Sequence, residues 1–219
     1  MSIESQINSL RMELPSTVKL VAVSKFKPNE DILAAYSAGQ RCFGENRPQE
    51  FAAKAQSLPK DIEWHFIGHL QTNKLKLVLP YASLIHSVDS LKLLSEIDKF
   101  AGLTGKVADI LLEAHIAKEE TKQGFSAGEI LSIDFSEYKN VCFRGVMGMA
   151  TFTDDENQVR SEFHSLHNLY DNVRNISIPE LSRFDQISMG MSHDYRIAVQ
   201  EGATIVRIGS NIFGARNTI

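Results

Sequence analysis

The chain has 219 residues, of which 43% are hydrophobic and 23% are charged, and its formal net charge is −4 at pH 7. These fractions are close to the averages of globular proteins, which excludes disordered, collagen-like and coiled-coil chains. A mildly negative net charge excludes a general attraction to nucleic acid or anionic membranes, although it is compatible with a local anion pocket.

Short β-rich runs alternate along the chain with stretches of helical periodicity. The predicted strands are residues 18–24, 41–44, 62–68, 84–88, 107–116, 141–149, 184–189 and 203–208. The helices predicted between them include residues 29–38, 48–57, 91–101, 127–133 and 157–173. This alternation predicts parallel strands joined by helical crossovers. Eight such units of about 27 residues each predict one α/β domain, a TIM (β/α)8 barrel over residues 1–219.

An open doubly wound sheet is the alternative architecture. Such a sheet usually carries a glycine-rich nucleotide loop after its first strand. Residues 23–28 contain no glycine, so the dinucleotide fingerprint is absent. The closed barrel is therefore the preferred fold.

Turns that contain glycine and serine follow the seventh and eighth predicted strands, where (β/α)8 barrels bind anions. Residues 188–194 lead directly into a helix, and Ser192 is placed to be its N-cap. After the eighth strand, Gly209 lets a ligand approach the backbone and Ser210 adds a hydroxyl donor. Either turn alone is more often structural, with its serine capping the turn. Together, on adjacent strands, they predict one phosphate-binding cup.

Lys25 lies at the carboxyl end of the first strand, which neighbours the eighth in a closed barrel. Strand alternation puts Lys25 on the same face as Val21 and Val23, so its side chain is expected in the barrel mouth. A partly desolvated lysine amine loses its proton more easily and can form a Schiff base with a carbonyl. The alternative is a solvated lysine at a strand end, and Lys27 is the local competitor.

A phosphate cup beside an inward-facing lysine predicts a phosphorylated aldehyde, and pyridoxal 5′-phosphate (PLP) carries both groups. Arg207 shares the parity of Ile205 and Gly209, so it is also expected to face the mouth. An arginine beside the pyridine nitrogen would keep that nitrogen unprotonated and weaken the ring as an electron sink. An ion pair inside the barrel is a nearly equal interpretation of Arg207.

A series of motifs runs from about Val18 to Arg216 in a fixed order. They are Val21-Ala22-Val23-Ser24-Lys25 with Pro28, Phe43-Gly44-Glu45-Asn46 with Gln49-Glu50, Trp64-His65-Phe66-Ile67-Gly68 with Leu70-Gln71-Thr72-Asn73-Lys74, Lys122 and Gly124, Arg144-Gly145-Val146-Met147, Ser188-Met189-Gly190-Met191-Ser192, and Val206-Arg207-Ile208-Gly209-Ser210 with Ile212-Phe213-Gly214-Ala215-Arg216. Their combination resembles the pyridoxal phosphate homeostasis proteins, the YggS/PROSC family of PLP-binding proteins.

The resemblance implies a barrel like the amino-terminal domain of alanine racemase. The cofactor-binding residues that it implies by motif position are Lys25 as the Schiff-base lysine, Met191, Ser192, Gly209 and Ser210 at the phosphate, Arg207 at the pyridine nitrogen, and Asn46 near the ring. It also implies a role in vitamin B6 homeostasis without established catalytic activity. The sequence departs from the family pattern at Arg47-Pro48, where Tyr-Val is frequent, and at Glu113-Ala114-His115, where Gln-x-Asn is usual.

Our leading hypothesis is a protein that holds or buffers PLP. The alternative is a PLP-dependent amino-acid racemase, which benefits from a second acid–base group on the opposite face of the cofactor. The chain ends at Ile219 without the carboxyl-terminal domain that supplies this group in alanine racemase, and Tyr195 is the available substitute. A third hypothesis is transfer of PLP to apo PLP-dependent enzymes.

Other features are consistent with a cytoplasmic monomer without nucleic-acid or membrane partners. The amino terminus lacks the features of a signal peptide, and no apolar run approaches the ~20 residues of a membrane span. Cys42 and Cys142 lie in apolar stretches and are expected to be small buried residues.

Two further patterns are interpreted as structural. Ser126 completes a G-x-S-x-G pattern but follows a polar loop, and with Glu129 it predicts a capping box. Two histidine pairs occur, at 65 and 69 and at 164 and 167, but neither has the context of a metal site, so no metal is expected.

Overall fold

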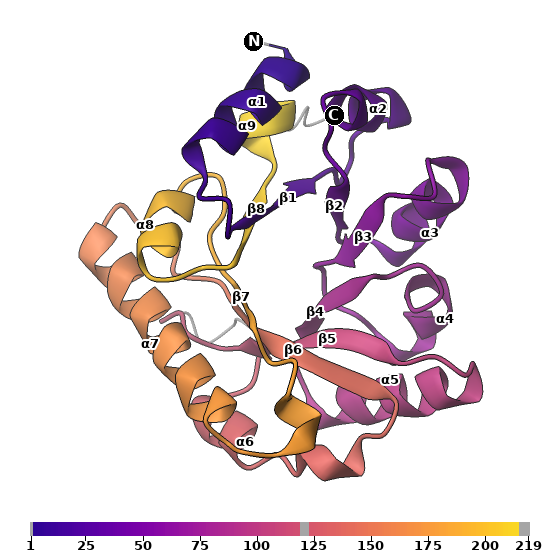
Figure 1. Cartoon of the computed structure of the whole chain (residues 1–219), viewed down its shortest axis with the longest axis vertical. Coiled ribbons are helices and arrows are strands. Elements are labelled where there is room, and N and C mark those ends of the chain that lie inside the picture. The colour runs from indigo at the N-terminus through magenta and orange to yellow at the C-terminus, as the bar shows by residue number, and fades with distance from the viewer. Residues whose placement is uncertain (1, 119–122, 215–219) are drawn as a thin grey trace.

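The computed structural model describes residues 2–118 and 123–214. In these residues eight parallel strands close into a barrel in sequence order, and helices surround it (Figure 1). The predicted (β/α)8 barrel is therefore confirmed. Lys122, Ala215 and Arg216, which belong to the motifs above, lie outside the described residues.

The eight predicted strands are all present, most of them shorter than predicted. The strands are β1 (Lys19–Val23), β2 (Cys42–Glu45), β3 (Glu63–Phe66), β4 (Leu84–Val88), β5 (Ala108–Ala114), β6 (Val141–Gly148), β7 (Gln186–Ser188) and β8 (Ile205–Ile208). The α-helices are α1 (Ile3–Glu13), α2 (Asn29–Ser37), α3 (Pro48–Ser57), α4 (Leu75–Val78), α5 (Leu91–Leu103), α6 (Ala127–Leu131), α7 (Glu156–Arg174), α8 (Tyr195–Gln200) and α9 (Ser210–Phe213). Short 3-10 helices are η1 (Thr72–Lys74), η2 (Phe135–Glu137) and η3 (Pro179–Leu181).

Helix α1 precedes the barrel and was absent from the sequence prediction. Its N-cap is Ser2, whose hydroxyl accepts a hydrogen bond from the Ser5 amide, and it buries Ile7 and Leu10. It packs against α2 and α9 (Figure 1). A capping serine followed by apolar residues at helical spacing is the signal that could have located this helix.

Closure of the barrel brings the first and last strands together. Val21 of β1 is in register with Arg207 of β8, and Val23 of β1 is in register with Gly44 of β2. The carboxyl ends of β8, β1 and β2 are therefore neighbours. Arg207 within β8, and Lys25 and Asn46 in the turns after β1 and β2, are consequently carried by adjacent strands.

Two apolar clusters build the core. The larger one lies between the barrel and the helices. The smaller one draws residues from six strands, so it fills the barrel interior: Val21, Cys42, Leu84, Leu111, Met147 and Ile205. Cys42 is buried as predicted, whereas Cys142 is only half-buried; both are free thiols.

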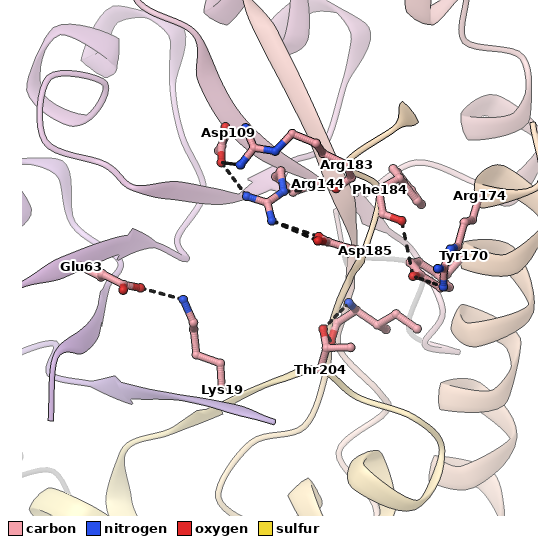
Figure 2. Close-up of polar contacts among 11 residues, drawn as sticks. Lys19, Glu63, Asp109, Arg144, Tyr170, Arg174, Arg183, Phe184, Asp185 and Thr204 are labelled. Atoms are coloured by element: carbon pink, nitrogen blue, oxygen red, sulfur yellow. Dashed lines mark hydrogen bonds and ion pairs between the residues drawn. The ribbon is translucent and has the colours of Figure 1, made fainter. Parts of the chain in front are cut away.

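The amino ends of the strands form the base of the barrel, which carries ion pairs that are partly exposed (Figure 2). Lys19 Nζ lies 2.7 Å from Glu63 Oε2, and both side chains are nearly half exposed. Arg144 joins Asp109 at 2.8 Å and Asp185 at 3.0 Å. These contacts tie neighbouring strands together at the water-facing end of the barrel.

Three helices begin with residues that favour helix starts. Ser126 and Glu129 form the predicted capping box, which accounts for the G-x-S-x-G pattern. Asp155 caps α7 and accepts hydrogen bonds from the amides of Asn157 and Gln158. Pro48 occupies the first turn of α3. In the described part of the chain, no helix is long and apolar enough to cross a bilayer.

Candidate functional site

A cavity of about 340 Å³ opens at the carboxyl ends of the strands. We call it the mouth cavity. Its lining residues are Val23, Lys25, Lys27, Asn46, Ile67, Gly68, Met149, Met191, Ser192, His193, Arg207, Gly209, Ser210 and Gly214. Every residue that the sequence analysis assigned to the cofactor is in this set.

Lys25 lies in the turn that follows β1. Val21 belongs to the interior cluster, and Val23 and Lys25 line the mouth cavity, so the predicted strand parity is confirmed. Lys27, expected to be a solvated lysine, is half-buried and lines the same cavity. Its ammonium donates to the carbonyl oxygen of Phe213 at 2.7 Å. Two lysines of different surroundings therefore reach one cavity.

The turns after β7 and β8 are joined directly. Gly209 N donates to Ser192 Oγ at 3.2 Å, and Asn211 Nδ2 donates to the Ser192 carbonyl at 3.1 Å. Together with Met191 and Ser210, Ser192 and Gly209 form one wall of the cavity, which we call the cup. Gly190 has a φ of +92°, and a Cβ there would lie 2.6 Å from Ala198 Cβ. The cup thus needs glycine at position 190.

The prediction that Ser192 caps the following helix is wrong. Helix α8 begins at Tyr195, and its N-cap is Asp194. The Asp194 carboxylate accepts a hydrogen bond from Met191 N at 2.5 Å, so the chain turns once more before the helix starts. The Ser192 hydroxyl instead bridges to the β8 turn.

Asn46 lines the cavity and has an unsatisfied acceptor. Its Oδ1 is buried and has no hydrogen-bond partner among the described residues. The β3 turn approaches Asn46 so closely that a Cβ on Gly68 would lie 2.2 Å from the Asn46 carbonyl oxygen. This close approach explains the glycine in the turn after β3. A buried acceptor without a donor is costly, so it is suited to a ligand that donates a hydrogen bond.

Arg207 is buried at the floor of the cavity and is held by neutral groups. Its Nη1 donates to Ser188 Oγ at 2.5 Å, and its Nη2 donates to the Gly148 carbonyl at 3.1 Å. Burial lowers the pKa of Arg207 to about 10, and Asp194 and Glu113 oppose this shift. The side chain therefore remains protonated at neutral pH.

A chain of buried side chains continues from Arg207 into the barrel. His86 Nδ1 lies 2.9 Å from Ser188 Oγ, and His86 Nε2 lies 2.8 Å from His65 Nδ1. Arginine only donates, so Ser188 accepts from Arg207 and has its own proton for His86 Nδ1. His86 then carries its proton on Nε2 and donates to His65. Both imidazoles are neutral, because burial lowers the pKa of His65 to about 3 and that of His86 well below its usual value.

These hydrogen bonds were not predicted from the sequence, where His65 was considered only beside His69 and rejected as part of a metal pair. The structure instead joins His65 on β3 to His86 on β4, while His69 contacts Asp89. Both His65 and His86 face inward on adjacent strands, and their alternation with outward apolar residues was a usable signal. His65 also lies near Cys42 and Glu63 in a group whose potential ligand atoms are within 4.8 Å of one another.

The departures from the family pattern lie beside the cavity. Arg47 is not a lining residue; its guanidinium stacks over Phe26, 4.3 Å from the ring centroid. Glu113 lies in a small adjoining pocket that shares Met149 with the mouth cavity. Burial, reinforced by Asp89, raises the pKa of Glu113 to about 7. Strand β5 thus adds a titrating carboxyl close to Arg207.

Tyr195, the proposed substitute acid–base group, does not line the cavity. Its hydroxyl donates to Glu13 Oε1 of α1 at 2.9 Å. This contact lies on the outer side of α8, where the ring is buried against the helical layer. The residue therefore ties α8 to α1.

Comparisons with known proteins agree with this geometry. Residues 1–217 match the model of the family described as alanine racemase, N-terminal domain. The chain is 41% identical to a pyridoxal phosphate homeostasis protein of Aquifex aeolicus over 90% of this chain and 87% of that one. It is 38% identical to a protein of the same name from Pasteurella multocida, over 92% and 88% of the two chains.

Solved structures extend the similarity to the fold. PipY of Synechococcus elongatus with PLP bound superposes with a TM-score of 0.88 at 36% identity, covering 97% of this chain and all of that one. Alanine racemase of Clostridium difficile superposes with a TM-score of 0.77 at 14% identity, covering 99% of this chain and 56% of that one. The second similarity concerns the barrel fold alone.

Proposed function

The chain belongs to the family of pyridoxal phosphate homeostasis proteins, and from this premise we propose that it binds PLP in the mouth cavity and takes part in intracellular PLP homeostasis. The observation that carries the proposal is the lining of one cavity by Lys25, Arg207 and the cup. The PLP-bound structure of PipY, a close structural relative, supports the choice of ligand.

The residues on two sides of the cavity would bind opposite ends of the cofactor. When bound, PLP supplies an aldehyde that reacts with amines and a ring that withdraws electrons. We assign the Lys25 amine to the aldehyde, where it would hold PLP as a Schiff base. The cup of Met191, Ser192, Gly209 and Ser210 would hold the phosphate through hydroxyl and backbone donors.

Arg207 and Asn46 would orient the ring. Arg207 is protonated at neutral pH and has donors only, so a pyridine nitrogen beside it stays unprotonated. An unprotonated ring is a weaker electron sink, which favours storage of PLP over carbanion chemistry. The unpartnered Oδ1 of Asn46 can accept a hydrogen bond from a hydroxyl of the ligand.

Absorbance spectroscopy tests the lysine assignment. Adding PLP to the protein should give the absorbance band of a lysine–PLP adduct, and borohydride reduction should trap the label on Lys25. Lys25→Ala should lose the band. Lys27→Ala is the matched control, because Lys27 lines the same cavity, and it should keep the band. A band that persists in Lys25→Ala would show that the assignment is wrong.

We propose that the protein carries PLP and does not turn over amino acids. Tyr195, the residue considered for a second acid–base group, is bound to Glu13 outside the cavity. Sustained exchange of the α-proton of alanine or serine by the loaded protein would contradict the carrier role. Faster activation of an apo PLP-dependent enzyme by loaded protein than by free PLP would identify transfer as the activity.

We also propose a monomer in the cytoplasm. The free thiols of Cys42 and Cys142 are suited to a reducing compartment. Cell fractionation would test the compartment, and light scattering of the purified protein would test the oligomeric state.

A further inference from the structure

The backbone at Lys25 has an unusual conformation. Lys27 N donates to the Ser24 carbonyl at 3.0 Å, so residues 24–27 form a β-turn with Lys25 and Phe26 at its centre. Phe26 has a φ of +65°, the one positive φ of a non-glycine residue in the described chain. A positive φ at the third position is the mark of a type II turn, where glycine is usual. The turn that carries Lys25 is therefore held against the preference of its own sequence.

Three charged side chains from β2 and α3 contact this turn. Ser24 Oγ donates to Glu45 Oε1 at 2.6 Å, and the Ser24 carbonyl accepts from Lys54 Nζ at 2.9 Å. On the other side of Lys25, Phe26 N donates to Glu50 Oε1 at 2.8 Å. We call Glu45, Lys54 and Glu50 the clamp, because they bind the residues on both sides of Lys25.

Lys54 links the two carboxylates of the clamp. Its Nζ lies 2.7 Å from Glu45 Oε1 and 2.6 Å from Glu50 Oε1. One oxygen of Glu50 therefore accepts from both the Lys54 ammonium and the Phe26 amide. The Phe26 amide is thereby coupled to the position of Lys54.

Stability is a weak explanation for these buried charges. Glu45 is fully buried, Lys54 is buried, and Glu45 Oε2 has no hydrogen-bond partner among the described residues. Burying charged groups costs desolvation free energy, which well-packed apolar residues of similar volume do not incur. Buried ion pairs can therefore often be replaced by apolar residues without loss of stability. A role in fixing one local geometry accounts better for a cluster whose hydrogen bonds converge on one turn.

The geometry that the clamp selects is the orientation of one peptide group. Type I and type II turns differ mainly in the direction of the central peptide, which here joins Lys25 to Phe26. Glu50 binds the N–H of this peptide and so favours the type II direction. Without Glu50, Phe26 can return to a negative φ by flipping the peptide, and the Lys25 backbone changes with it.

We propose that Glu45, Lys54 and Glu50 are positioning residues that aim the Lys25 side chain into the mouth cavity. The proposal rests on the proposed role of Lys25. Within the segment 43–50, only Asn46 has a role in the proposed function. The positioning role adds a function for Glu45 and Glu50 of the same segment. The orientation of Lys25 matters because Lys27, two residues away, also lines the cavity and offers a second amine.

Glu50→Ala tests the proposal, because it removes the acceptor of the Phe26 amide. We expect the affinity for PLP to fall about tenfold. This is the factor that corresponds to the loss of one hydrogen bond to a charged group. Borohydride trapping followed by peptide mapping should find label on Lys27 as well as on Lys25. A general loss of stability would lower the total label without moving it to Lys27.

Two matched variants complete the test. Glu50→Gln keeps an oxygen for both donors, so it should retain the affinity and label Lys25 alone. Glu63→Ala removes the glutamate of the Lys19 ion pair at the other end of β1, and it should leave affinity and labelling unchanged. If Glu50→Ala does not fold by circular dichroism, Glu50→Asp replaces it, since its shorter side chain withdraws from Phe26.

Hydrogen exchange of the cofactor-free protein separates this proposal from the proposed function. The Phe26 amide should exchange about tenfold faster in Glu50→Ala than in the parent, and at the parent rate in Glu63→Ala. Unchanged exchange, unchanged affinity in Glu50→Ala, or an equal loss in Glu50→Gln would each overturn the positioning role. A PLP adduct that survives Lys25→Ala would overturn the role of Lys25 instead, whatever the exchange rates.

Discussion

The two ends of the barrel use polar side chains in opposite ways. At the base, Lys19 and Glu63 form an ion pair that is nearly half exposed to water. Below the mouth cavity, His65, His86, Ser188 and Arg207 are all at most 4% exposed and form one hydrogen-bonded chain. Water screens the first arrangement, whereas the second loses hydration and depends on complete pairing.

This difference separates stability from function within one barrel. An exposed ion pair contributes little to stability and can be exchanged without disturbing its neighbours. A buried chain specifies proton positions and side-chain orientation, at the risk of a large loss when one member is removed. Buried polar groups, whose desolvation is unfavourable, are therefore found at the mouth end, where a ligand must be oriented.

The largest expected effect is the response of His65 to acid. Its pKa is about 3 in the folded chain and about 6.5 when unfolded, so the stability from neutral His65 is present above pH 6.5 and is lost as pH falls toward 3. The full loss is about 5 kcal/mol of unfolding free energy. His65→Asn keeps an acceptor for His86, so urea unfolding should show a smaller loss between pH 7 and pH 4.

The matched control is His164→Asn, which changes an exposed histidine on α7. It should keep the acid sensitivity of the parent protein. Equal pH dependence in His65→Asn and the parent would contradict a neutral, buried His65.

The second effect concerns Glu113 and has the opposite dependence on pH. Its folded pKa of about 7 exceeds its unfolded value, so the stability from the neutral carboxyl is complete below pH 4.5 and is lost as pH rises through 7. Glu113→Gln should therefore gain stability relative to the parent as pH rises, by roughly 3 kcal/mol above pH 7. Urea unfolding from pH 4.5 to 8 measures this; a difference that stays constant over that range argues against burial of an ionising group.

The third effect comes from removing Ser188, which lies in the middle of the hydrogen-bonded series from Arg207 to His65. Ser188→Ala leaves Arg207 Nη1 and His86 Nδ1 without their shared partner, which should cost about 2 kcal/mol. In the parent, ¹⁵N spectra should show both His65 and His86 with the proton on Nε2. The exposed Ser165→Ala on α7 is the control and should stay within about 0.5 kcal/mol of the parent. Protons on Nδ1 of both histidines would reverse the direction assigned to the chain.

The smallest effect is expected at the base. Lys19→Met breaks the exposed pair with Glu63 and should change the unfolding free energy by less than about 1 kcal/mol, with a smaller difference in high salt. PLP binding should be unchanged. A loss comparable to that of Ser188→Ala would remove the contrast between the two ends.

Much of this molecule could be predicted from its sequence. The alternation of strands and helices predicted the barrel, and strand parity correctly placed Lys25, Arg207 and Gly209 at one mouth. These predictions succeeded because side-chain direction alternates along a strand and the carboxyl ends of parallel strands share one edge. The short helix α4 and the start of α8 were harder to predict from the sequence, because such short helices depend on tertiary packing.

The details of the site depended on contacts between distant segments. Ser192 was expected to cap a helix, but Asp194 occupies the N-cap position, and its carboxylate binds the Met191 amide and makes no capping hydrogen bond. His65 was compared with its sequence neighbour His69, although its partner is His86 on the next strand. Neither choice can be made from spacing along the chain.

The sequence by itself determined the barrel, the family and some of the residues at its mouth, because these follow from local periodicity and from motifs in a fixed order. Only the tertiary structure decided how these residues are held. The positive φ of Phe26, the clamp formed with Glu45, Lys54 and Glu50, and the buried chain behind Arg207 all arise from side chains on different elements. Such contacts become favourable only when folding excludes water and brings the separate elements together.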